Sequence, residues 1–87
     1  MVFMSTDIPE GRLRVLQDVA LERAYQDEKF PGQDHPMAGW LLVLQKHTGR
    51  VASDVLDLAK ADLARHHLVR VAAIAVAAIE SIDRRKR

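Results

Sequence analysis

The 87-residue chain contains no cysteine, so disulfides, thiolate metal sites and cysteine nucleophiles are excluded. Aromatic residues make up only 5% of it, and Trp40 is the single tryptophan. No glutamate lies between Glu28 and Glu80. Residues 51–87 hold neither glycine nor proline, and nothing in that segment interrupts a helix through its backbone chemistry.

Long apolar runs are also missing. The longest, from Val71 to Ile79, is half a membrane span or less. The N-terminus has no basic segment followed by an apolar run, which a signal peptide requires. We therefore expect a soluble, cytoplasmic protein without a membrane partner.

Charge is unevenly distributed around a net value of +1. Residues 1–40 carry seven acids and four bases, for a charge of −3, and residues 41–87 carry five acids and nine bases, for +4. This basic bias is mild compared with the surfaces that bind nucleic acids, so we expect no nucleic-acid partner.

The size and composition indicate one small folded domain spanning residues 1–87. Hydrophobic residues make up 48% and charged residues 29%, as in a folded rather than a disordered chain. We expect residues 1–8 to form an N-terminal arm and residues 84–87 a basic tail. So short a chain buries only a modest core, and a partner subunit would add to it.

Apolar residues recur at helical spacing, and no stretch alternates as a strand does. The first helix is expected from about residue 9 to residue 28, after capping side chains in the segment STDIP. Its packed stripe is predicted to contain Leu13, Leu16, Ala20 and Ala24, widened by Val15 and Val19.

A loop and two further helices complete the predicted all-α fold. Residues 30–36, FPGQDHP, form the loop because two prolines and a glycine interrupt any helix. The second helix begins near Met37, with a break at about Lys60–Asp62, where Asp62 is a candidate N-cap. The third helix ends near Asp83. Its middle is apolar on nearly every side, which predicts a helical bundle completed by oligomerisation, most simply as a homodimer.

The pattern His-x-x-Arg occurs twice, as His47/Arg50 and His67/Arg70. Residues three apart on a helix have Cβ atoms about 5–6 Å apart, so both side chains of each pair can contact the same ligand group. If the second and third helices form an antiparallel hairpin, both pairs face a common cleft. Buried cations need an anion or internal carboxylates as partners.

The segments ERAYQDEKFPGQDHPMAGWLLVL, GRVA and LVRVAAIAVAAIESIDRR resemble short MazG-like nucleotide pyrophosphohydrolases, members of the all-α NTP pyrophosphatase superfamily. The resemblance covers about residues 18 to 85 and implies a MazG-like helical bundle. In that family, acidic motifs on two helices hold Mg²⁺ against a nucleoside triphosphate. The aligned positions here are Lys46, His47, Arg50, His67 and Arg70. The resemblance therefore implies a degenerate member, in which Mg²⁺-dependent pyrophosphohydrolase activity is not expected.

Our leading hypothesis is a cleft that binds an anionic, phosphorylated ligand or nucleotide without a metal or another cofactor. Arg50 and Arg70 would meet the anion directly, because a guanidinium binds phosphate oxygens bidentately. Lys46 would contribute at the rim, and Trp40 would either stack on a base or anchor the core at the start of the second helix. Side chains of the first helix that could border this cleft are Arg23, Gln26 and Lys29.

Three alternatives stay open. In a repurposed metal-independent enzyme, His47 and His67 would act as general acid and base. In a site for Zn²⁺ or another transition metal, both histidines would join one aspartate, Asp54 or Asp57. In a structural or interaction dimer, Arg50 would pair with Asp54, Arg70 would pair with Asp54 or Asp57, and neither histidine would carry chemistry.

Overall fold

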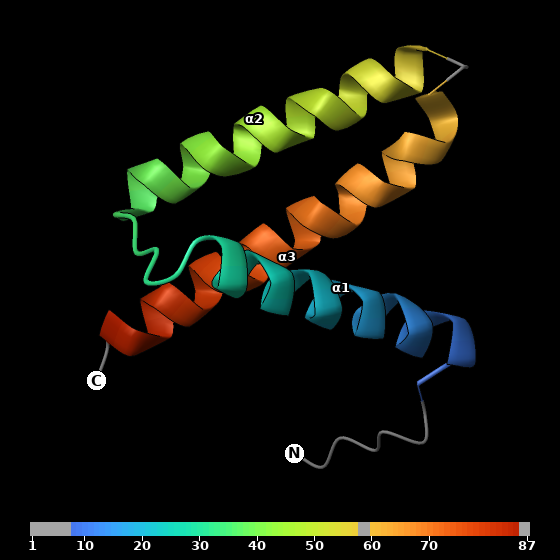
Figure 1. Ribbon diagram of the computed structural model, residues 1–87. Helices are drawn as coiled ribbons and strands as arrows, with labels where there is room; N and C mark the ends of the chain where they lie inside the picture. Colours follow the sequence, from blue (N-terminus) through green and yellow to red (C-terminus); the bar gives the residue numbers. More distant parts are fainter. Residues whose placement is uncertain (1–7, 58–59, 86–87) are drawn as a thin grey trace.

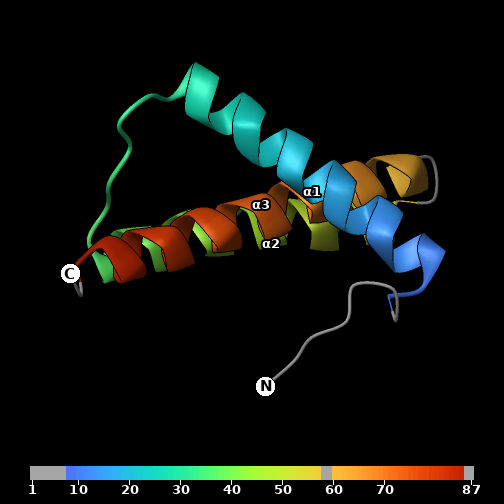
Figure 2. The same cartoon turned by 90° about the horizontal axis from the view of Figure 1, so that it is seen from below.

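A computed structural model describes residues 8–57 and 60–85. These residues form three helices, α1 (Glu10–Lys29), α2 (Met37–Leu56) and α3 (Ala61–Arg85), and contain no strand. α2 and α3 run antiparallel as a hairpin, and α1 crosses α3 at a wide angle (Figures 1 and 2). α3 is the central element, since it packs against both α1 and α2. The predicted all-α class is confirmed.

The predicted loop at residues 30–36 is confirmed, and it connects helices whose starts are both set by proline. The carbonyl of Pro9 accepts a hydrogen bond from Leu13 N at 3.0 Å, and that of Pro36 accepts one from Trp40 N at 3.1 Å. Both prolines adopt extended ψ values, of 144° and 163°. Residues 5–7, with the predicted capping side chains, lie outside the described part of the chain.

The predicted break between the second and third helices is confirmed, with one correction. α2 ends at Leu56, and Lys60 N donates to the Asp57 carbonyl at 2.8 Å. α3 begins at Ala61, so Asp62 lies in its first turn and is not the N-cap. Its carboxylate still suits this position, because the N-terminal end of a helix favours negative charge.

The α2–α3 hairpin is held by a hydrogen bond between Asp54 of α2 and His67 Nδ1 of α3. Asp54 is buried, at 6% exposure, so this contact satisfies a carboxylate that would be costly without a partner. The prediction that Asp54 pairs with Arg50 or Arg70 is therefore wrong. The reason is geometric, since Asp54 points across the hairpin toward α3.

We expect Asp54→Ala to lower the free energy of unfolding by about 1–3 kcal/mol, because it leaves His67 without its partner inside the hairpin. Asp54→Asn, which keeps an oxygen for the hydrogen bond, should cost less. Urea denaturation followed by circular dichroism measures both values. Ser53→Ala, at the exposed neighbouring position, is the matched control. Equal stability of Asp54→Ala and Ser53→Ala would show that the hydrogen bond adds nothing.

The hydrophobic core is small and lies where α2 meets α3. Trp40 packs there with Ile74, Ala77 and Ala78, and Val43 and Leu44 cover the cluster in part. Small alanine side chains on α3 allow the helix axes to approach closely. The other buried apolar residues are Val19 and Ala73. No helix in the described residues is long and apolar enough to span a bilayer.

α1 packs through only part of the predicted apolar stripe. Val19 is buried as predicted, but Leu13 and Leu16 are 44% and 49% exposed, and Val15, Ala20 and Ala24 are also exposed. The cause is polar, because side chains of α1 form ion pairs with α3. These pairs are Asp18–Arg65 at 2.8 Å, Arg23–Glu80 at 2.8 Å and Glu22–Arg70 at 3.7 Å.

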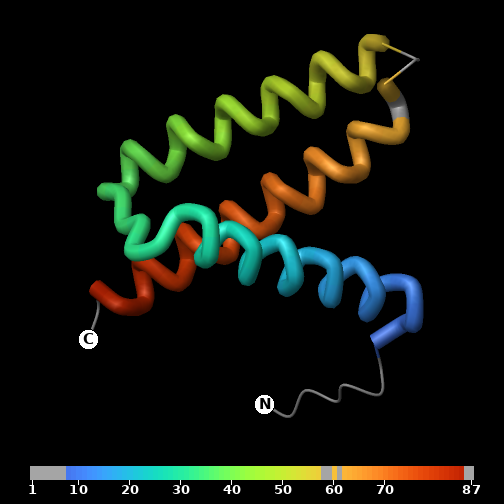
Figure 3. Tube along the Cα trace, in the orientation of Figure 1, coloured from blue at the N-terminus to red at the C-terminus, as the bar shows by residue number. Residues whose placement is uncertain are grey.

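The 30–36 loop is anchored to the C-terminal turn of α3, beside which it passes on its way to α2 (Figure 3). Ser81 Oγ, buried at 1% exposure, donates to Asp34 Oδ1 at 2.6 Å. Arg85 donates to Asp34 and to the carbonyl of His35. The Ser81 hydrogen bond, aided by the nearby arginines, lowers the pKa of Asp34. α3 continues to Arg85, beyond the predicted end at Asp83.

Candidate functional site

The principal cavity of the described residues has a volume of about 410 Å³ and lies between α1 and the α2–α3 hairpin. All three helices and the 30–36 loop contribute side chains to it. The lining residues are Glu22, Arg23, Tyr25, Gln26, Asp27, Lys29, Phe30, Gln33, Trp40, Val43, Lys46, His47, Arg50, Arg70, Ile74 and Ala77. We call this cavity the interhelical pocket.

Five of the six predicted site residues line the interhelical pocket: Trp40, Lys46, His47, Arg50 and Arg70. They come together because α2 and α3 run antiparallel, so that residues from both His-x-x-Arg segments reach the same space. The sixth, His67, is not among the lining residues. It turns instead to Asp54 within the hairpin.

Lys46 and Arg50 are the pocket cations of α2, and neither carries a compensating charge. Neither side chain forms an ion pair or hydrogen bond with any residue in the described segments. Both are exposed on α2, so water solvates them when no ligand is bound. A cation of this kind is available to an incoming anion without first breaking an internal contact.

The pKa of His47 is lowered by burial and by its position among the cations of the pocket. Burial is the main cause that lowers its pKa, followed by the charges of Arg50, Arg70 and Lys46 and by His67. Each of these effects disfavours the imidazolium, so the ring is neutral at neutral pH. Neutral imidazole has one donor and one acceptor nitrogen, and it can therefore hydrogen-bond an anion or accept a proton.

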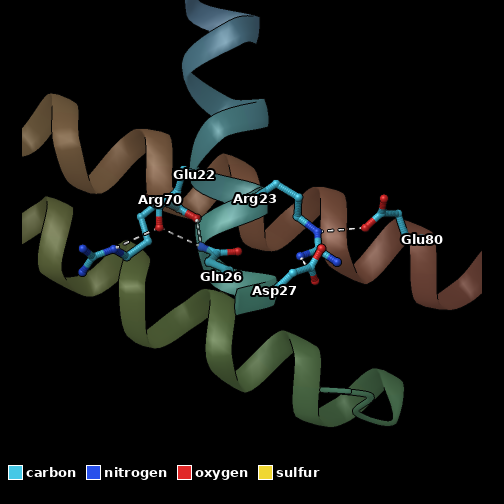
Figure 4. Close-up of polar contacts among 6 residues, drawn as sticks. All are labelled: Glu22, Arg23, Gln26, Asp27, Arg70 and Glu80. Carbon is cyan, nitrogen blue, oxygen red and sulfur yellow. Dashed lines mark hydrogen bonds and ion pairs between the residues drawn. The ribbon is translucent and has the colours of Figure 1, made fainter. Parts of the chain in front are cut away.

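Arg70 is held between α3 and α1. Its Nε lies 3.7 Å from Glu22 Oε2, and its Nη2 donates to His66 Nε2 at 3.0 Å. Gln26 joins the same group, since its Nε2 donates to Glu22 at 3.2 Å and to the Arg70 carbonyl at 3.4 Å (Figure 4). The Glu22 contact is long for an ion pair, and it leaves guanidinium N–H groups of Arg70 for another acceptor.

Arg23, the neighbour of Glu22 in α1, contacts a different part of α3, at Glu80. Burial disfavours its charge, but hydrogen bonds to Asp27 and Glu80 outweigh this effect and raise its pKa (Figure 4). Asp27 and Glu80 therefore neutralise Arg23, while Glu22 faces Arg70. The cations left for a ligand are Lys29, Lys46, Arg50 and part of Arg70.

The remaining wall of the pocket is largely apolar and aromatic. Tyr25 and Phe30 of the α1 end are half exposed, at 50% and 52%. Trp40 is 3% exposed. The ring of His35 packs edge-on against it, with 4.8 Å between the two ring centroids. The buried Nε1–H of Trp40 has no hydrogen-bond partner among the described residues. Tyr25 and Phe30 beside unpaired cations suit a ligand that has both an anionic and a flat apolar part, whereas Trp40, buried in the core, exposes no ring face for the predicted stacking on a base.

No three His, Asp or Glu side chains gather into a group able to hold a metal ion anywhere in residues 8–57 and 60–85. The set considered for a transition metal, with His47, His67, Asp54 and Asp57, does not form such a group. His67 and Asp54 contact each other directly, whereas His47 faces the pocket.

The sequence pattern missed much of the α1 wall. It suggested Arg23, Gln26 and Lys29 as border residues, and all three line the pocket, but it did not select Glu22, Tyr25 or Phe30. The available signal was the clustering of these residues in the segment 22–30, directly before the loop that leads to Trp40. Comparisons with known protein families, with characterised proteins and with solved structures found no match.

Proposed function

We propose that the interhelical pocket binds an anionic, phosphorylated small molecule, such as a nucleotide, without Mg²⁺. The observation that carries this proposal is the pair of unpaired cations, Lys46 and Arg50, in a cavity of about 410 Å³. Arg70 supplies a second guanidinium, and His47 a neutral hydrogen-bonding ring. Charge-assisted hydrogen bonds from two guanidinium groups can hold phosphate oxygens with no bridging metal.

The chain is, on this proposal, a degenerate relative of MazG-like pyrophosphohydrolases. The family's acidic motifs would fall on Lys46, His47, Arg50, His67 and Arg70, so a cationic cluster replaces a cation-binding one. Glu22 and Asp27 supply carboxylates to the pocket from α1, but Glu22 faces Arg70 and Asp27 pairs with Arg23. Inversion of the local charge favours direct binding of the phosphate over binding through Mg²⁺.

The test is titration of the intact chain with inorganic pyrophosphate and with a panel of nucleotides, each with and without EDTA. Trp40 is the only tryptophan and lines the pocket, so its fluorescence reports binding without a label. We expect saturable binding that EDTA leaves unchanged and that salt weakens. Absence of binding to every probe, or binding that requires Mg²⁺, would overturn the proposal.

The runner-up function is a metal-independent enzyme, and one observation favours it. His47 is kept neutral by burial and neighbouring cations, as a general base must be. Its partner in the two-histidine hypothesis, His67, lies outside the pocket lining. Phosphate or pyrophosphate release in the presence of EDTA, lost in His47→Ala, would favour this enzyme over simple binding.

The pH dependence of binding provides a further prediction. An anion beside His47 stabilises the imidazolium and raises the pKa of His47 above its lowered value in the free protein. Affinity should therefore increase as pH falls through the raised pKa, and level off below the pKa of the free form. Sulfate is the suitable probe, because its charge is constant over this range. In His47→Gln the affinity for sulfate should be flat with pH, and a slope equal to that of the unaltered protein would contradict a role for His47.

We also propose that the chain self-associates. Among the described residues, only six apolar side chains are buried in the single chain, namely Val19, Trp40, Ala73, Ile74, Ala77 and Ala78. Larger apolar residues remain exposed on all three helices, among them Leu16, Leu41 and Ile79. A core of this size is small for an independent domain, and a second copy would remove more apolar surface from water.

A further inference from the structure

α3 carries a regular apolar stripe that neither α1 nor α2 covers. The stripe consists of Leu68, Ala72, Ala75, Ile79 and Ile82, which we call the α3 seam. Successive members are spaced by four, three, four and three residues, the spacing that brings side chains into line along paired helices. Leu68 and Ile79 are 54% and 57% exposed, and the other three are only half-buried.

Contacts on the other sides of α3 show that the α3 seam is its free face. His67 and the buried Ile74 and Ala78 turn toward α2, whereas Arg70 and Glu80 contact α1. At about 100° per residue, the seam positions form one stripe directed away from both groups. α1 and α2 therefore occupy two sides of α3, and the third remains apolar and open.

We propose that the α3 seam pairs antiparallel with the same seam of a second copy of the chain. In this arrangement Leu68 of one copy lies beside Ile79 of the other, and Ala72 lies beside Ala75. The stripe is nearly symmetric about its centre, so the two copies present identical, self-complementary surfaces related by a two-fold axis. Alanines meet at the middle, where they let the two helices approach closely, and larger residues oppose each other on either side.

Charge at the edge of the seam favours the antiparallel orientation and the second copy as occupant. Arg65 and Asp83 flank the seam on the same side, near opposite ends of α3. Antiparallel pairing brings Arg65 of each copy beside Asp83 of the other. Arg65 also pairs with Asp18 in its own chain, but its side chain is 60% exposed and its guanidinium has further donors.

This inference rests on the proposed self-association, and the first experiment separates the two. Sedimentation velocity is measured over a range of concentrations for the intact chain, for Ile79→Asp and for Leu42→Asp. Leu42 is the matched control, an exposed leucine of α2 at 68% exposure. We expect a dimer that Ile79→Asp weakens by about a hundredfold or more, since each dimer would bury two unpaired carboxylates, and that Leu42→Asp leaves unchanged.

Circular dichroism of the same variants shows whether each remains helical, as expected for substitutions at exposed positions. A monomer at every concentration would contradict both self-association and the seam. A dimer that persists in Ile79→Asp would contradict the seam alone.

Cross-linking tests the orientation, because the chain has no cysteine of its own. Leu68→Cys and Ile79→Cys chains are mixed and oxidised. Antiparallel pairing predicts a disulfide between the two different variants, whereas the two Leu68 positions would lie about 16 Å apart along the helices, beyond the reach of a disulfide. Disulfides only between identical variants would overturn the antiparallel arrangement.

Exchanging the two charges tests the predicted ion pair between Arg65 of one copy and Asp83 of the other. Asp83→Arg should weaken the dimer by about two- to fivefold, as expected for an exposed ion pair made twice, and Arg65→Asp combined with Asp83→Arg should restore it. A double variant no tighter than Asp83→Arg would contradict the predicted pairing of Arg65 with Asp83.

Discussion

Arg50→Ala is expected to reduce the affinity for inorganic pyrophosphate by about tenfold to a hundredfold, the range for one lost hydrogen bond between charged groups in a partly enclosed site. Arg50 lines the interhelical pocket and has no ion-pair partner in the described residues, so its loss removes no internal contact. The effect should therefore appear in binding and leave the urea midpoint unchanged.

Two companion variants distinguish three contributions to affinity. These are the geometry of the Arg50 guanidinium, its local positive charge, and the net charge of the protein. Arg50→Lys keeps the charge but cannot form two parallel hydrogen bonds, and we expect a loss between those of the unaltered protein and Arg50→Ala. Arg14→Ala, at an exposed position on α1 outside the pocket lining, changes net charge equally. Calorimetric titration measures all three. Equal affinities of Arg50→Ala and Arg14→Ala would show that Arg50 does not contact the anion.

Trp40→Ala is expected to lower the free energy of unfolding by about 3–5 kcal/mol, the usual range when a large buried aromatic is truncated. Trp40 is the largest member of the small core cluster, and its ring contacts the 30–36 loop through His35. Small domains are stable by only about 5–15 kcal/mol, so this single change should remove much of the cooperative transition.

The matched variants are Trp40→Phe and Leu42→Ala. Trp40→Phe should cost less than Trp40→Ala, because Trp40 Nε1 has no hydrogen-bond partner among the described residues and only volume is lost. Leu42 is 68% exposed, so Leu42→Ala should change stability by no more than about 0.5 kcal/mol. Urea denaturation followed by circular dichroism measures the series. Similar values for Trp40→Ala and Leu42→Ala would contradict a core role for Trp40.

Local patterns predicted the three helices and the loop because these features depend on neighbours in the chain. The prolines at 31 and 36 end one helix and open the next through backbone chemistry that any fold must respect. The two His-x-x-Arg segments could be assigned to two helices for the same reason, and their common cleft was predicted on the condition that these helices form an antiparallel hairpin. Lys46, His47, Arg50 and Arg70 line one pocket, as that reasoning predicted, whereas His67, predicted with them, contacts Asp54 instead.

Contacts between residues far apart in the chain could not be obtained in this way. Asp54 had several basic candidates within reach, and only the rotation of α2 against α3 selected His67. α1 offered an apolar stripe through Leu13 and Leu16, yet ion pairs such as Arg23–Glu80 turned a more polar face toward α3. Helical periodicity predicts which residues share a face, whereas the partner of that face depends on the summed packing and charge of the whole assembly of helices. Only the tertiary packing therefore placed Glu22 among the residues that line the pocket.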